Sequence, residues 1–353
     1  MGATFHRCGR TTRARPTKID DEDLTQTMNG LASIKAPLTL SLVALSLAGC
    51  GGGSGGGNGS IDDGSLPVTN NVQFPTELRT VVATGDLTTS NYLDVGGPLF
   101  GVIRNLVQGG GIGPAGVVKQ PSAGDDRPYA LGVPLVAGPC AIGGGIIVTT
   151  TDADGNGRIN VGDFIEVTAQ DCQDADNLAP LTGKYRATYA AVDFSANGTV
   201  AASDITVTID PGGLTLAGYG IIEGSTRIWS RSEGTSLHQF LRYDTTISQD
   251  GTAPVVYNVD LDRRLSLTGD TTKVGGGFSI QGQAFSASAA ALQSSPGLPP
   301  SSGELMIGDA AGDKLRLNAV SAETFDVELL PGGAAPPVAS QTGLLWTNFG
   351  NQF

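Results

Sequence analysis

The succession of short alternating segments that fills the chain from residue 127 onward limits the fold more than any other feature. Apolar and polar residues alternate there with a period of two, as in the run Val255-Val-Tyr-Asn-Val-Asp-Leu-Asp-Arg-Arg-Leu265. A period of two is that of a β-strand, whose successive side chains point to opposite faces of a sheet. Turn sequences such as Ala196-Asn-Gly198 and Asp210-Pro-Gly-Gly213 separate the segments. We therefore predict antiparallel strands joined by hairpins.

The length of these segments favours a wide sheet over a compact sandwich. The predicted strands 236–248, 254–268 and 274–288 are much longer than the usual 5–6 residues. Glycine is abundant, with 52 residues, and only 16% of the chain is charged, which suits strands and turns rather than helices. We expect an all-β fold: a large antiparallel meander sheet, curved or forming a partial barrel, with a short N-terminal helix and a disordered N-terminus.

Helical spacing of apolar residues occurs near the start of the predicted folded part. Leu99, Val102, Ile103 and Leu106 follow one another at intervals of three, one and three residues. This spacing places all four on one face of a helix. We therefore predict a short helix over residues 98–107.

The first 50 residues have the pattern of a processing signal. Lys35 precedes the apolar run 38–47, which has ten residues, whereas a membrane-spanning helix needs about 20. A basic residue, a short apolar run and small residues at its end are typical of a secretory signal. The ending Leu-Ala-Gly-Cys50 resembles a bacterial lipobox. The resemblance implies cleavage before Cys50, lipid on that cysteine and anchoring in a bacterial outer membrane, with the leaflet left open.

Residues 1–27 do not fit this signal, because they are polar and lie upstream of Met28. We interpret them as an extension beyond the native start. The predicted organisation is then the extension 1–27, a lipoprotein signal peptide 28–49, a Gly/Ser tether 50–66, a mixed helix and loop segment 67–126, a main antiparallel β domain 127–295 with a hairpin at 140–172, and a C-terminal β meander 296–353 packed on the same domain.

The charge of the chain argues against nucleic-acid binding. Acidic residues number 34 and basic residues 21, which gives a net charge of −13. Residues 1–49 contain six basic and four acidic residues, so their removal leaves 15 basic and 30 acidic residues and a net charge of −15. A strongly acidic surface repels phosphate backbones and attracts divalent cations. We interpret Arg263-Arg264 as an exposed pair beside acidic residues.

Two cysteines remain once Cys8 is assigned to the extension and Cys50 to lipid. Cys140 lies sixteen residues before Asn156, and Cys172 lies sixteen residues after it. A hairpin centred on Asn156 would make the two cysteines cross-strand neighbours. Export would place them in an oxidising compartment, so we predict that they form a disulfide bond.

Between these cysteines lies the stretch that indicates a ligand most specifically, Asp152-Ala-Asp-Gly-Asn-Gly-Arg-Ile-Asn-Val-Gly-Asp163. Oxygen-bearing side chains stand at its positions 1, 3, 5, 9 and 12, with glycine at 6 and an aliphatic residue at 8. This is the spacing of a calcium-binding loop. The predicted calcium ligands are Asp152, Asp154, Asn156, the main-chain carbonyl of Arg158, Asn160 and Asp163.

The twelve residues resemble the loop of an EF-hand, and Gly157-Arg-Ile-Asn160 followed by Asp163 resembles the dockerin variant. Asp163 stands where the EF-hand has glutamate, which predicts a lower affinity. The flanking segments 146–151 and 164–169 are β-branched rather than helical. We therefore predict a calcium loop at the tip of a β-hairpin that acts as a constitutive stabiliser and not as a switch.

The block from Cys140 to Cys172, together with the segment from Pro300-Ser-Ser-Gly303 to Trp346, resembles uncharacterised proteobacterial lipoproteins. This resemblance brings no known activity. Within that segment we predict that Trp346 fills the core of the C-terminal meander.

The residues favour a binding or structural role over catalysis. His238 is the one histidine left after processing, and no nucleophile motif points to it. We expect a non-enzymatic, lipid-anchored, calcium-binding envelope protein with a structural, adhesive or ligand-binding role. One alternative is a carbohydrate-active enzyme or carbohydrate-binding module with structural calcium, with Asp260, Asp262, Asp193 and Glu223 as candidate carboxylates. Another is a lipid-carrying half-barrel. The ligand, whether carbohydrate, lipid or protein, is left open.

Overall fold

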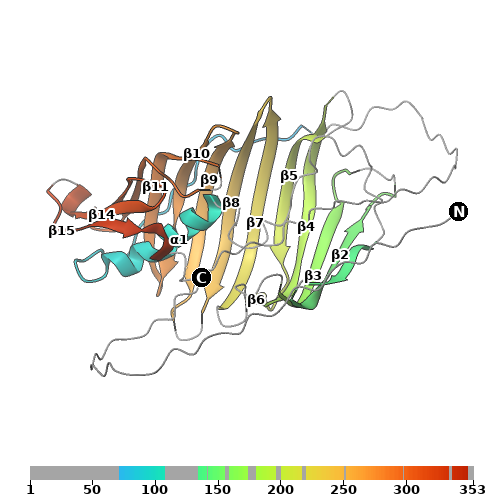
Figure 1. The fold of residues 1–353 in the computed structure, drawn as a ribbon, viewed down its shortest axis with the longest axis horizontal. Helices are drawn as coiled ribbons and strands as arrows, with labels where there is room; N and C mark the ends of the chain where they lie inside the picture. The colour runs from blue at the N-terminus through green and yellow to red at the C-terminus, as the bar shows by residue number, and fades with distance from the viewer. Residues whose placement is uncertain are drawn as a thin grey trace, which may run out of the picture. The chain divides into compact units, whose positions relative to one another are not determined.

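The alternating segments form a single antiparallel sheet of 15 strands (Figure 1). All residues that the structure, a computed structural model, describes belong to one unit, Ala36–Phe353. The other unit, Met1–Lys35, and the predicted extension, signal and tether with Cys50 lie outside the described residues. The described ranges are 71–107, 134–140, 142–155, 159–173, 180–195, 200–216, 220–249, 252–296, 298–333 and 336–348.

Strands that are neighbours in the chain are also neighbours in the sheet, except at β6, which pairs with both β4 and β7. The predicted all-β meander is therefore confirmed. The strands are β1 (Pro134–Pro139), β2 (Gly143–Thr151), β3 (Phe164–Gln173), β4 (Leu181–Phe194), β5 (Val200–Ile209), β6 (Leu214–Leu216), β7 (Gly220–Glu233), β8 (Ser236–Ser248), β9 (Val255–Leu265), β10 (Asp270–Ile280), β11 (Gln283–Ser294), β12 (Glu304–Gly308), β13 (Lys314–Ala319), β14 (Thr324–Leu330) and β15 (Ala339–Leu345).

One predicted strand was wrong and one observed strand was not predicted. The segment 274–288 is not one strand, because β10 and β11 meet there at a tight turn made by Gln281 and Gly282, which have φ values of 54° and 78°. Such a turn usually has Asn or Asp before the glycine, whereas here the preceding residue is Gln281. The strand β1 was not predicted.

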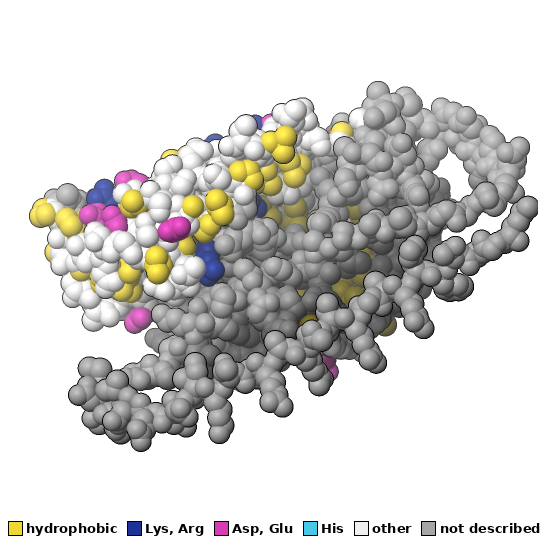
Figure 2. Space-filling model, in the orientation of Figure 1, with side chains coloured by type: hydrophobic (Ala, Val, Ile, Leu, Met, Phe, Trp, Pro, Cys, Tyr) yellow, Lys and Arg dark blue, Asp and Glu magenta, His cyan; other side chains and the backbone are white. Residues whose placement is uncertain are grey.

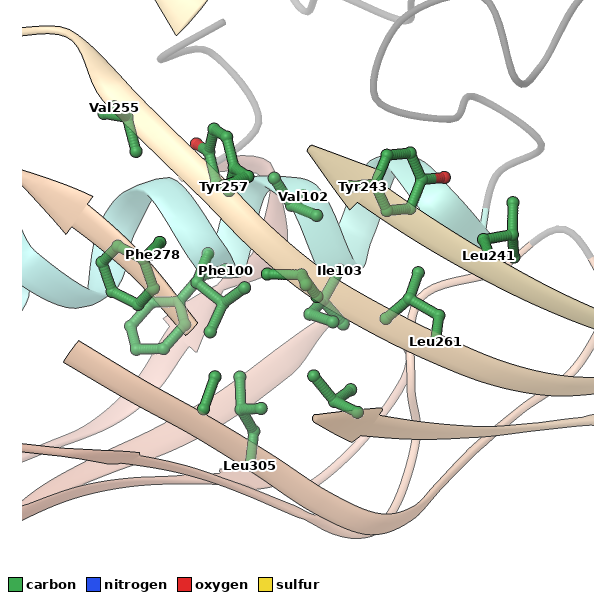
Figure 3. Close-up of a cluster of buried hydrophobic side chains, with 14 of the residues drawn as sticks. Phe100, Val102, Ile103, Leu241, Tyr243, Val255, Tyr257, Leu261, Phe278 and Leu305 are labelled. Atoms are coloured by element: carbon green, nitrogen blue, oxygen red, sulfur yellow. The ribbon is translucent and has the colours of Figure 1, made fainter. Parts of the chain in front are cut away.

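The predicted helix is present as α1 (Tyr92–Val107), six residues longer at its start than expected. The extra turns begin after Asn91, whose carbonyl accepts the first helical bond from the N–H of Val95 at 2.9 Å. Figure 3 shows Phe100, Val102 and Ile103 directed towards side chains of β8, β9, β10 and β12.

The sheet curves around α1, because strands far apart in the sheet contact the same helix. The ring of Phe100 lies 5.4 Å from that of Phe325 on β14, in an edge-to-face contact. Phe325 in turn packs against Trp346, in the short 3-10 helix η3 (Trp346–Asn348), with the two tilted rings 4.4 Å apart. The indole N–H of Trp346 donates to the carbonyl of Ser321 at 3.2 Å. The prediction that Trp346 fills this core is therefore confirmed.

Residues 71–86, which we call the strap, cross the outer face of the sheet, the face opposite α1. Arg79 bonds to the carboxylate of Asp260 on β9, Thr80 forms a parallel bridge with Gly276 on β10, and the N–H of Thr84 donates to Ala284 on β11. Under the start of the strap lies a small second core of buried apolar side chains, made by Val72, Ala202, Trp229 and Phe240.

The glycines of β10 make room for the strap. A Cβ atom built on Gly275 would lie 2.5 Å from the Cβ of Leu78, and one on Gly277 would lie 2.9 Å from the Cβ of Val81. Both distances are too short for carbon atoms, so glycine is required where the strap crosses. On the face seen in Figure 2, the described charged side chains are scattered among uncharged and apolar ones.

Candidate metal centre

The predicted calcium loop connects two paired strands. β2 ends at Thr151 and β3 begins at Phe164, and these two residues pair directly across the hairpin. Residues 152–163 therefore form the tip, where the sequence predicted them. Ile159 packs against the main core, which fixes the returning half of the loop to the sheet.

Three carboxylates converge at this tip. One oxygen from each of Asp152, Asp154 and Asp163 lies within 4.8 Å of the others. Two ligands on opposite sides of a calcium ion are separated by about twice 2.4 Å, so one ion can contact all three. The predicted ligands Asn156 and Arg158 lie outside the described residues. The fit therefore rests on the three aspartates and on Asn160.

Asp163 holds the loop in its folded form. Its side chain is fully buried, and its two carboxylate oxygens accept the main-chain N–H groups of Ala153 at 2.8 Å and Asn160 at 2.7 Å. These bonds tie the outgoing and returning halves of the loop together. Both carboxylate oxygens of Asp163 thus accept bonds from main-chain N–H groups. Asp163 therefore has less freedom to bind a metal through both oxygens than the longer glutamate side chain would have.

Burial is the main influence on the charge of Asp163. Desolvation raises the pKa of this carboxyl, the two main-chain N–H groups lower it, and the charges of Asp152 and Asp154 raise it again. The balance is a raised pKa. A cation at this point would offset both the desolvation and the repulsion, which are the two causes that raise the pKa.

The side chain of Asn160 is a second observation that fits a metal ion in this loop. Its side-chain N–H donates to Asp154 at 2.8 Å, while its amide oxygen is buried and has no hydrogen-bond partner. Buried polar atoms in folded proteins nearly always have partners. The unpartnered atom is the oxygen that the loop pattern assigns to the metal.

The loop is also joined to β4, a contact that the sequence did not reveal. The N–H of Tyr189 donates to the carbonyl of Asp163 at 2.9 Å, and the N–H of Gly162 donates to the carbonyl of Tyr189 at the same distance. The sequence pattern of a calcium loop specifies only its metal ligands. It therefore does not predict main-chain hydrogen bonds between the loop and a neighbouring strand.

The predicted disulfide between Cys140 and Cys172 is present, with the two Cα atoms 5.4 Å apart. Its position differs from the expected one. Cys140 lies in the connection between β1 and β2, with its N–H bonded to the carbonyl of Gly144, while Cys172 is on β3 and pairs with Leu181 of β4. The bond therefore closes the base of the hairpin from outside β2.

The candidate carboxylates on β9 are engaged by cationic or basic side chains. Asp260 accepts bonds from Arg79 and Arg242. Asp262 lies 2.7 Å from Nε2 of His238, whose ring stacks on Phe74 of the strap at 4.8 Å. The bonds of Arg79 to Asp260 and the stacking of Phe74 on His238 join the strap to the sheet directly, whereas Asp262 bonds to His238 of the sheet.

The interpretation of Arg263-Arg264 as an exposed pair was wrong for Arg263. Arg264 is exposed on the outer face, while Arg263 is buried on the helix side. Neighbouring residues of a strand point to opposite faces, so one of the two had to point inwards. The signal was the apolar alternation of Val259 and Leu261, which continues into Arg263.

No family model, no curated protein and no solved structure matches the chain. Within the described ranges, no helix is long and apolar enough to cross a membrane.

Proposed function

We propose that the protein is a lipid-anchored, calcium-binding protein of the bacterial envelope, in which calcium stabilises the β2–β3 hairpin. The proposal rests on one observation above all, the convergence of Asp152, Asp154 and Asp163 within 4.8 Å at the hairpin tip. Three carboxylates at this separation repel one another, and a divalent cation relieves that repulsion. Their loop spacing favours calcium, which prefers several oxygen ligands.

The role that follows is structural or ligand-binding and not enzymatic. Calcium at the tip and the disulfide at the base would hold the two ends of one hairpin, which is itself joined to β4. The hairpin lies between the edge strand β1 and the rest of the sheet. A metal there stabilises the end of the sheet that is farthest from α1 and the C-terminal strands.

Calorimetry and thermal unfolding of the full chain test the metal site. Calcium titrated into the wild type should give saturable heat, and calcium at 100 times the dissociation constant should stabilise it by about 2.7 kcal/mol. Asp152→Ala should abolish this gain and leave the melting temperature in chelator unchanged. Asp210→Ala, which changes a half-exposed aspartate in the turn after β5, is the control and should respond to calcium like the wild type.

Two results would contradict the proposal. One is the absence of calcium heat at millimolar concentration. The other is an equal loss of stability by Asp152→Ala in calcium and in chelator. The lipid anchor is tested separately: mass spectrometry of the envelope fraction should find an acylated chain that begins at Cys50, and Cys50→Ser should release the protein into the soluble fraction.

A second candidate role, the carrying of an amphiphile in a half-barrel, is favoured by the helix-side face of β3–β7. That face presents buried apolar and aromatic side chains, including Val167, Tyr185, Tyr189 and Val207. In Figure 1, α1 lies over the other half of the sheet. The apolar face is therefore wider than the described helix covers.

A further inference from the structure

The helix-side face changes character at one level of the sheet. A row of directly paired residues across β5, β7, β8, β9 and β10 is wholly apolar: Ile205, Ile228, Leu241, Leu261 and Val274. Two residues further along each strand, the next row on the same face is wholly polar. We call this row the polar belt, and its members are Ser203, Ser230, Gln239, Arg263 and Thr272.

The belt contains buried polar atoms that lack partners. Arg263 is only 7% exposed and Thr272 only 3%, and the two are direct neighbours across β9 and β10. Nε of Arg263 and the hydroxyl of Thr272 have no hydrogen-bond partner. Burial lowers the pKa of the Arg263 guanidinium, which the charges of Tyr243 and Asp270 oppose. In the described part of the chain, no carboxylate forms an ion pair with Arg263.

A second buried guanidinium belongs to α1, the helix that packs on this face of the sheet. Arg104, in the last turn of α1, is 3% exposed, and its Nε and Nη1 atoms have no hydrogen-bond partner. It follows Ile103, which Figure 3 shows next to Leu261, a member of the apolar row beside the belt. None of the described acidic residues forms an ion pair with Arg104.

Buried guanidinium nitrogens without an acceptor are costly in a folded protein, because a charge removed from water needs a partner of opposite sign. Nε of Arg263 and the Nε and Nη1 atoms of Arg104 are such nitrogens. The fork of N–H donors on arginine matches carboxylate and phosphate oxygens, and a threonine hydroxyl can donate to the same oxygens. An anion at the belt would supply the missing acceptors. The apolar row lies directly beside the belt, so the rest of the anion's molecule would meet an apolar surface.

We propose that the polar belt and Arg104 bind the carboxylate or phosphate group of an anionic amphiphile, whose apolar part lies on the adjoining apolar face of the sheet. This inference rests on the second candidate role, the carrying of an amphiphile, and is independent of calcium. In this proposal Arg263 and Arg104 recognise the charged headgroup, and the hydroxyl of Thr272 is a neutral hydrogen-bond donor to it.

Three probes of equal chain length test the headgroup: dodecyl phosphate, dodecanoate and dodecanol, titrated into the full chain by calorimetry. The wild type should bind both anions at least about tenfold more tightly than dodecanol, since a hydrogen-bonded charge contributes that much. Arg263→Met and Arg104→Met should each weaken anion binding by roughly 10- to 100-fold and leave dodecanol binding unchanged. Arg264→Met, on the same strand but exposed, is the matched control.

Ligand-free stability separates recognition from a structural role. Both methionine variants should melt no lower than the wild type without ligand, because they remove an unpaired buried charge and keep an apolar stem. A lower melting temperature, or failure to fold, would mean that the guanidinium groups serve the fold, and would overturn the assignment. Arg263→Lys keeps the charge but loses the fork, and should fold and bind the anions with intermediate affinity.

The remaining outcomes distinguish the amphiphile-carrying role from the anion site. Equal binding of dodecanol and dodecyl phosphate would leave the amphiphile-carrying role standing and refute the anion site. Binding of none of the three probes would refute both. Unchanged anion binding in Arg263→Met and Arg104→Met would refute the assignment of these two residues.

Discussion

Replacement of Asp260 by alanine should release the strap from the outer face of the sheet. The Asp260 side chain is fully buried and accepts four hydrogen bonds. Two come from Arg79, from its main-chain N–H at 2.9 Å and its Nε at 2.8 Å. The other two come from Arg242, from Nε at 2.9 Å and Nη2 at 2.8 Å. The buried carboxylate of Asp260 thus binds one arginine of the strap and one arginine of the sheet.

The expected cost follows from what alanine leaves behind. Removal of one partner from a buried ion pair costs about 3–5 kcal/mol, because the other charge stays desolvated. The side chains of Arg79 and Arg242 are 22% and 34% exposed, so both can regain some hydration. We therefore expect Asp260→Ala to lower the free energy of unfolding by about 3 kcal/mol, the lower end of that range.

Urea unfolding measures this cost, and trypsin reports on the strap itself. The strap contains a trypsin site after Arg79, which the bonds to Asp260 hold against the sheet. Cleavage after Arg79, followed by mass spectrometry, should be much faster in Asp260→Ala than in the wild type. The control is Asp262→Ala on the same face of β9, which loses only the contacts to His238 and Lys273 and should cost about 1 kcal/mol or less. A loss below about 1 kcal/mol for Asp260→Ala, with cleavage no faster than in the control, would refute this account of the strap.

Three further changes test other parts of the fold. Gly275→Val places a side chain where the strap residue Leu78 lies, so cleavage of the strap by trypsin should rise; unchanged cleavage would contradict the close crossing. Trp346→Ala should lower the free energy of unfolding in urea by about 3–5 kcal/mol, since it empties a fully packed site, and a cost under about 1 kcal/mol would show that the site is not filled as described. The double change Cys140→Ser with Cys172→Ser should cost about 3–4 kcal/mol, from the closure of a loop of this length, and the effect should equal that of reducing agent on the wild type.

The sheet was predictable because its signal is local. Each strand carries its own alternation, and the hairpins need only the turn between two strands. The merged prediction for 274–288 shows the limit of this signal, since the Gln281-Gly282 turn between β10 and β11 lacks the Asn or Asp that usually precedes its glycine. A local signal also predicted α1, because the spacing of its apolar residues defines one face of a helix.

The strap was not predictable, because its conformation depends on residues far away in the chain. The apolar residues Phe74, Leu78, Val81 and Val82 have helix-like spacing, yet residues 71–86 form no helix. The bonds of Arg79 to Asp260, which hold the segment on the sheet, span 181 positions. The glycines that admit the strap are on β10, where they look like weak points of a strand. In the metal loop the side-chain positions followed from spacing, whereas the bonds of Asp163 to the main chain and to Tyr189 required the fold.

The path of residues 71–107 has a consequence for the order in which the molecule assembles. The strap and α1 come first in the described chain, yet their partners come late: Val72 bonds to a residue 121 positions away, Arg79 to one 181 away and Leu87 to one 222 away. Hairpins between neighbouring strands close quickly, whereas such distant contacts form slowly. During synthesis, which starts at the N-terminus, this segment must therefore stay undocked until β12 has been made. The first described residues to be made are thus the last to be placed, and their docking completes the fold.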